Sequence, residues 1–141
     1  MKPSTGFMAN NIDNYQMNVV FQPPVNVYRG AEVGAVPIKT KAGWLCIYCN
    51  ANTSDHPEWT IGAALLDLHN PGVILAQTRE PILQPETAAE LSGVVNNVTF
   101  PSGAVVVGDE LYVYYGSGDQ GCCLATCKLK DLLGYLIESG K

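Results

Sequence analysis

Residues 101–116 read PSGAVVVGDELYVYYG, and this stretch decides the fold. Two apolar runs flank a Gly-Asp pair, which is the pattern of a β-hairpin closed by a tight turn. Residues 37–48 read PIKTKAGWLCIY and form a similar unit, in which Leu45 matches Leu111 at a separation of 66 residues, from 45 to 111. A repeat of this length built from strands is typical of the blades of a β-propeller.

The first predicted blade spans residues 34–78. Its strands are separated by a short turn containing Gly43, a polar loop and the turn signal HNPG at residues 69–72. Consecutive antiparallel strands of this kind exclude a parallel α/β fold, whereas a sandwich or a barrel would also suit short strands and frequent turns. The four predicted strands are residues 35–40, 44–49, 60–68 and 73–78.

The rest of the chain adds a second, partial blade to an all-β fold within one domain, residues 1–141. Residues 1–33 are predicted to be an irregular N-terminal segment, and residues 79–100 a long connection. The second blade, residues 101–141, is expected to contain the hairpin, a strand at 122–129 and a short C-terminal helix at 130–138, where leucines recur on one face. About two antiparallel blades are too few to close a ring.

Charge and hydropathy exclude several classes of partner. The net charge of −5 and the scattered basic residues argue against nucleic acid, which needs clustered Lys and Arg. The apolar runs fall short of the ~20 residues of a membrane-spanning helix. The N-terminus has no apolar core of a signal peptide, so the predicted localisation is cytoplasmic and no membrane partner is expected.

The five cysteines do not indicate a metal centre. Cys46 and Cys49 lie in a predicted strand, where residues three apart point to opposite faces of the sheet. Cys123 and Cys127 would have to supply the second half of such a site. We therefore predict no metal ligands and no cofactor, and we interpret these cysteines as small buried residues.

Four motifs occur in order along the chain: GAVPIKTKAGWLCIY (34–48), IGAALLDLHNP (61–71), NVTFPSGA (97–104) and LYVYYGSGD (111–119). Together they resemble glycoside hydrolase family 130, the β-mannoside phosphorylases and β-mannosidases. The segment at 111–119 is similar to the family's Tyr-Tyr-Gly-Ala-Ala-Asp. The resemblance implies a five-bladed β-propeller, which at this repeat would need about 330 residues, so the chain would form about two blades from its C-terminal portion.

The resemblance also implies a chemistry. In the family a general acid aspartate protonates the glycosidic oxygen while phosphate or water attacks with inversion. The family's blades that carry this acid and most phosphate-binding arginines have no counterpart here, so we predict no catalytic residue. Asp119 matches the family aspartate that resembles a sugar-hydroxyl ligand, a role that suits a carboxylate. The alternative is a turn aspartate bonded to its own backbone.

Two further residues are predicted to bind substrate. Glu90 lies where the family carries acidic residues near the rim of its active site, although it would also fit a solvated loop. Tyr115 could stack on a sugar ring, as could Tyr48 and Tyr114, although most such tyrosines pack in a core. Cys49 takes the position of a family His that looks like a phosphate ligand, and a neutral thiol binds anions poorly. We therefore predict no phosphate-binding residue, which puts inorganic phosphate as a co-substrate in doubt.

These observations favour one function and leave two alternatives. The first is a partial glycoside hydrolase or phosphorylase propeller related to β-mannoside-active enzymes and inactive as an isolated chain, with a mannose-containing carbohydrate as its ligand. The second is a complete, non-catalytic carbohydrate-binding or structural protein that forms a homo-oligomer to cover its open strand edges. The third is a mannosidase that takes its acid from a neighbouring chain.

Overall fold

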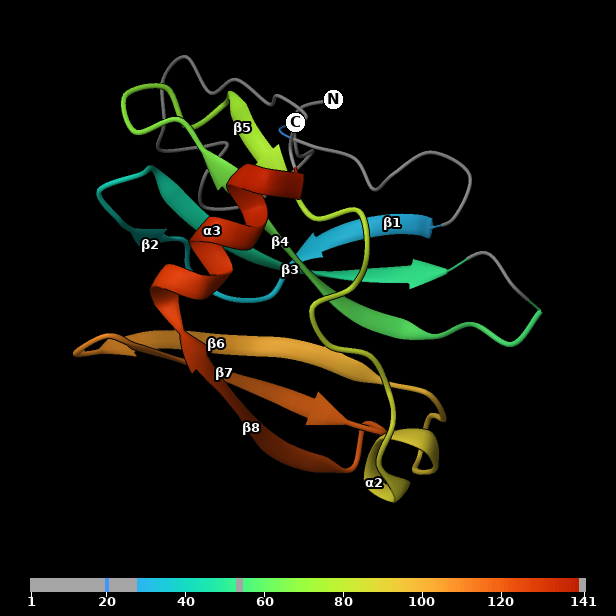
Figure 1. Ribbon diagram of the computed structural model, residues 1–141. Coiled ribbons are helices and arrows are strands. Elements are labelled where there is room, and N and C mark those ends of the chain that lie inside the picture. The colour runs from blue at the N-terminus through green and yellow to red at the C-terminus, as the bar shows by residue number, and fades with distance from the viewer. Residues whose placement is uncertain (1–19, 21–27, 53–54, 140–141) are drawn as a thin grey trace, which may run out of the picture.

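The computed structural model describes residue 20 and residues 28–52 and 55–139, which form two antiparallel sheets and two helices (Figure 1). The first sheet has the strand order β1-β3-β4-β5, with β2 also pairing with β3. Its strands are β1 (Tyr28–Val33), β2 (Ile38–Lys39), β3 (Trp44–Asn52), β4 (Trp59–Leu66) and β5 (Ile74–Gln77).

The second sheet has three strands in the order β6-β7-β8 and lies beneath the first in Figure 1. The helix α3 follows β8 and runs along one side of both sheets, while α2 lies at the end of the second sheet where β6 begins. These elements are β6 (Thr99–Val107), β7 (Glu110–Ser117), β8 (Gly121–Lys128), α2 (Ala88–Leu91) and α3 (Leu129–Ser139).

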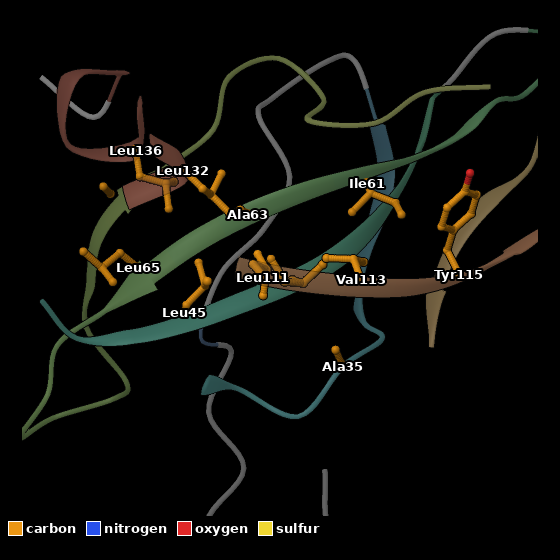
Figure 2. Packing of buried hydrophobic residues seen from close by; sticks show 12 residues of the cluster. Ala35, Leu45, Ile61, Ala63, Leu65, Leu111, Val113, Tyr115, Leu132 and Leu136 are labelled. Atoms are coloured by element: carbon orange, nitrogen blue, oxygen red, sulfur yellow. The ribbon is translucent and has the colours of Figure 1, made fainter. Parts of the chain in front are cut away.

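The core fills the space between the two sheets. Alternate residues of β7 point inward, so Leu111, Val113 and Tyr115 are buried while Tyr114 is exposed. Figure 2 shows this row facing the first sheet, with α3 closing one side. The residues that meet it are Leu45 and Ile47 of β3, Ile61, Ala63 and Leu65 of β4, and Leu132 and Leu136 of α3. The alternation therefore fixes which face of the second sheet is buried.

The prediction of antiparallel strands followed by a short C-terminal helix is confirmed, but several details differ. The strand predicted at residues 35–40 is reduced to β2, Ile38–Lys39. Residues 28–33, predicted to be irregular, form strand β1, which pairs with β3. The predicted connection contains the single helical turn α2, and its last two residues, Thr99 and Phe100, already belong to β6. Strand β1 escaped prediction because it lies at an edge of the sheet, where main-chain hydrogen bonds suffice and no apolar alternation is needed.

The outer face of the second sheet carries several exposed apolar side chains. Tyr114 and Leu124 lie directly opposite each other on β7 and β8 and are 44% and 48% exposed. Val105 on β6 extends this face and is 45% exposed. In the described part of the chain, no helix has the length and apolar character needed to cross a membrane.

Candidate functional site

Asp119 occupies the tight turn between β7 and β8. Its φ of 51° and the φ of 57° at Gly118 put both residues in the left-handed region. Gly118 is buried, and a Cβ there would lie 2.8 Å from the carbonyl oxygen of Ala89 and 3.2 Å from the Cα of Gly93. Glycine is therefore required at 118. The segment that contains Ala89 and Gly93 packs directly on Gly118 and so fixes the position of the next residue, the exposed Asp119.

Backbone hydrogen bonds hold the segment 92–98 against this turn. The N–H of Val95 donates to the carbonyl of Gly118, and the N–H of Gly118 donates to the carbonyl of Val98, both at 3.1 Å. On its other side the segment meets the start of β4, where the N–H of Trp59 donates to the carbonyl of Asn97 at 2.9 Å. One segment therefore connects the first sheet to the turn that carries Asp119.

A depression of about 480 Å³ lies at this junction. Asp119 is the one titratable residue among the described residues that line it, and two of the lining residues, Trp59 and Phe100, are aromatic. The lining residues are Trp59, Val95, Val98, Phe100 and Asp119. An exposed carboxylate beside aromatic side chains offers both hydrogen bonds and an apolar surface, which are the two contacts that a sugar ring can make.

Glu90 of α2 and Tyr115 of β7, both predicted to bind substrate, form a hydrogen bond with each other. The Tyr115 hydroxyl donates to Glu90 Oε1 at 2.6 Å. The backbone N–H groups of Glu86 and Thr87 donate to Glu90 Oε2, each at 2.8 Å. Glu90 is 3% exposed, so its carboxylate is buried with both oxygens engaged. A direct contact between Glu90 and a sugar would require at least one of these bonds to open, and that contact stays a prediction.

The hydrogen bonds keep this buried carboxylate ionised. Burial raises the pKa of Glu90, but the bonds from the Tyr115 hydroxyl and from the N–H groups of Glu86 and Thr87 outweigh it and lower the pKa to about 2. Burial, followed by the bond to the Glu90 carboxylate, raises the pKa of Tyr115, so the phenol stays protonated and continues to donate. Near neutral pH the pair is therefore a carboxylate and a neutral phenol.

Cys49 lies within β3, opposite Ile61 of β4 and Glu32 of β1. Burial, followed by the Glu32 carboxylate, raises the pKa of the Cys49 thiol to about 12. Its sulfur lies 3.7 Å from the carbonyl oxygen of Asn50, to which the thiol donates. The side chain is a buried, neutral thiol, which offers an anion no positive charge. The interpretation of the cysteines as buried residues is confirmed for Cys46 and Cys49 but is wrong for Cys127, which is exposed on the edge strand β8.

The structure brings some of the predicted residues together and separates others. Asp119 lies on the turn that follows the Tyr115–Glu90 pair, whereas Tyr48 is fully buried and Tyr114 lies on the outer face of the second sheet. Sequence reasoning missed Trp59 and Phe100 as lining residues. They are 41 positions apart in the chain, and tertiary contacts such as the parallel bridge between Trp59 and Val98 bring them to the same place.

A second cavity, of about 410 Å³, lies between the sheets under α3. Its wall is mainly apolar, with Ile61, Leu111 and Leu132 among the lining residues. A carbohydrate needs hydrogen-bonding groups that such a wall does not supply. The depression at Asp119 is therefore the better candidate for a sugar site.

Comparison with known proteins identifies relatives of this chain. Residues 12–138 match glycoside hydrolase family 130, described as beta-1,4-mannooligosaccharide phosphorylase. The 1,2-beta-oligomannan phosphorylase of Thermoanaerobacter sp. (strain X514) is 40% identical over 120 residues, which are 84% of this chain and 40% of that protein. The beta-1,2-mannobiose phosphorylase of Listeria innocua is 40% identical over 108 residues, which are 77% of this chain and 30% of that protein.

A solved structure agrees with these matches. The beta-1,2-mannobiose phosphorylase from Listeria innocua, in complex with beta-1,2-mannobiose, superposes with a TM-score of 0.73 at 36% identity. The match covers 82% of this chain and 32% of that one. The chain thus spans 30–40% of the length of these curated relatives, and its sheets and C-terminal helix correspond to part of the family's propeller structure.

Proposed function

The chain belongs to glycoside hydrolase family 130, and on this premise we propose that it binds a mannose-containing carbohydrate in the depression around Asp119. The observation that carries the proposal is the exposed carboxylate of Asp119, held in a left-handed turn beside Trp59 and Phe100. A carboxylate can accept two hydrogen bonds from adjacent sugar hydroxyls, and an aromatic face packs against the apolar face of a pyranose. The relatives named above act on mannosides, which supports mannose as the sugar.

We further propose that the chain forms about two blades of a five-bladed propeller and does not turn over mannosides by itself. Glycoside cleavage needs an acid to protonate the leaving oxygen. Among the described residues that line the depression, Asp119 is the one carboxylate, and its proposed task is to bind hydroxyls. The buried thiol of Cys49 gives phosphate no positive charge at the position of the family histidine.

Binding can be tested by titrating the 141-residue chain with β-1,2-mannobiose while its tryptophan fluorescence is recorded. A Trp44→Phe background leaves Trp59, in the depression, as the reporter. We expect saturable binding with a dissociation constant on the order of 1 mM, which Asp119→Asn weakens about tenfold. Ser102→Ala, on exposed β6, is the matched control and should bind like the background protein. An Asp119→Asn variant that binds as tightly as the control would refute the site.

We also propose that the chain forms a homo-oligomer through the outer face of the second sheet. Tyr114, Leu124 and Val105 are exposed apolar residues on that face, opposite the face that packs on the first sheet. Such surfaces on soluble domains commonly mark protein interfaces. This apolar face needs no opposite charge on its partner, so a second copy can pack against it symmetrically.

Light scattering coupled to size exclusion tests this assembly. The wild-type chain should elute as an oligomer, and the paired substitution Tyr114→Lys with Leu124→Lys should convert it to a monomer with unchanged circular dichroism. A Lys substitution at exposed Glu80, outside the second sheet, provides the control. A wild-type chain that is monomeric at ~100 μM would refute the homo-oligomer.

A further inference from the structure

We infer that Glu90 is a positioning residue whose buried carboxylate fixes the turn that carries Asp119. The inference rests on the proposed function of Asp119 as the sugar contact. It assigns Glu90 a role that requires no contact with the sugar. It concerns three consecutive connections: from Glu90 to β7, from Glu90 to the segment 92–98, and from that segment to the turn.

The first connection runs through the side chain. Tyr115 lies on β7, four residues before Asp119, and its hydroxyl donates a hydrogen bond to Glu90 Oε1 at 2.6 Å. Because this bond joins a neutral donor to a buried carboxylate, it is stronger than a bond between two neutral groups. The strand that leads into the turn is thereby tied to α2, which lies outside the sheet.

The second connection runs through the backbone. Glu90 closes the first turn of α2 as the fourth residue of a capping box that begins at Thr87. Its carbonyl oxygen accepts the N–H of Val98 at 3.0 Å. The segment 92–98 therefore begins two residues after Glu90 and returns to the Glu90 backbone carbonyl. The carboxylate holds Glu90 in place, and Glu90 holds both ends of this loop.

The third connection joins this loop to the turn itself. Val95 and Gly118 are joined by a hydrogen bond of 3.1 Å, and Gly118 and Val98 by another of the same length. Gly93 packs so closely on Gly118 that a Cβ on Gly93 would lie 2.3 Å from the Gly118 carbonyl oxygen. Gly118 and the next residue, Asp119, are the two left-handed residues of the turn. If the Glu90 carboxylate is lost, the loop and the turn should loosen together.

Amide hydrogen exchange measures this loosening without any ligand. The amides of Val95, Gly118 and Val98 report the loop and turn, and the amide of Ile61, which donates to the Leu83 carbonyl at 2.8 Å, reports the rest of the fold. Glu90→Ala should speed exchange at the three reporter amides at least about tenfold more than at Ile61. Glu86→Gln, which changes an exposed carboxylate of the same segment, is the matched control and should leave all four amides unchanged.

Two further variants separate positioning from general destabilisation. Tyr115→Phe removes one hydrogen bond of the carboxylate and should show the same local pattern with a smaller increase, which keeps the test available if Glu90→Ala does not fold. Glu90→Gln retains the shape of the side chain and one acceptor oxygen, which can still accept the N–H groups of Glu86 and Thr87, and should recover part of the protection. In titrations with β-1,2-mannobiose, the variant whose reporter amides exchange fastest should bind the sugar most weakly.

The outcomes distinguish this inference from the proposed function. Exchange that rises equally at Gly118 and Ile61 in Tyr115→Phe would overturn the positioning role, because Glu90 would then act on the whole fold. Unchanged exchange at Gly118 in Glu90→Ala would also overturn it. If the wild-type chain binds no mannobiose but the local exchange pattern appears, the proposed sugar site fails while Glu90 still holds the turn.

Discussion

Replacing Glu90 with Gln should remove a stabilisation that depends on pH. The pKa of this carboxyl is lowered from its ordinary value of 4.5 to about 2 by hydrogen bonds that outweigh the effect of its burial. Each pKa unit is worth about 1.4 kcal/mol, so this lowering of the Glu90 pKa means that the ionised carboxylate stabilises the fold by about 3 kcal/mol relative to its neutral form. Glu90 is 3% exposed, so solvent screens this contribution little.

The sign follows from the direction of the pKa change. A carboxyl whose pKa is lower in the folded state stabilises the fold above its unfolded pKa, and this stabilisation is lost as the pH falls through the folded pKa. The full contribution should therefore be present at pH 5 and above, and less than about 0.5 kcal/mol should remain at pH 2. Gln resembles the neutral acid and cannot contribute at any pH.

Urea unfolding of the wild type and Glu90→Gln between pH 2 and 7 measures the difference. We expect the wild type to be more stable by about 3 kcal/mol at pH 5–7, and the two curves to converge near pH 2. Glu86→Gln, an exposed carboxylate of the same segment, is the control and should follow the wild type at every pH. A gap between wild type and Glu90→Gln that stays constant from pH 7 to pH 2 would refute the account of this carboxylate.

Three further predictions concern the core and the cysteines. Leu111→Ala should lower the free energy of unfolding by about 3–5 kcal/mol in urea, because Leu111 is fully buried between the sheets, and a loss below about 1 kcal/mol would contradict that packing. Thr60→Val should raise the same quantity by about 1 kcal/mol, because the buried Thr60 Oγ1 has no hydrogen-bond partner among the residues that the structure describes, and a clear loss of stability would contradict this. In a thiol-labelling time course at pH 8, exposed Cys122 should react in the native state, whereas Cys46, whose pKa is raised to about 11 by burial, should react only after unfolding. Equal labelling rates would contradict this difference.

The sequence predicts those elements whose side chains follow a regular period. In β7 the period of two places Leu111, Val113 and Tyr115 on the buried face, as the structure confirms. In α3 the buried Leu132 and Leu136 recur four residues apart, as expected for one face of a helix. In both elements one face is buried, and the spacing of the apolar residues in the sequence therefore predicts the conformation.

Other elements leave a weaker signal or none. Strand β1 is held by main-chain bonds to β3, which do not depend on residue type. Helix α2 has one turn, too short for an apolar period, although the capping-box spacing from Thr87 to Glu90 could have revealed it. For the candidate site, family resemblance drew attention to Asp119, while Trp59 and Phe100 reach the same depression only through tertiary contacts.

The central claim is that a mannoside binds in the depression beside Asp119, and an NMR titration tests it most directly. Uniformly ¹⁵N-labelled chain would be titrated with β-1,2-mannobiose while amide and indole resonances are followed. We predict that the largest shifts occur at Asp119 and Gly118, in the segment 92–98 and at the Trp59 indole, with little change in β5. Shifts confined to other surfaces, or no shifts at ~20 mM sugar, would contradict the claim.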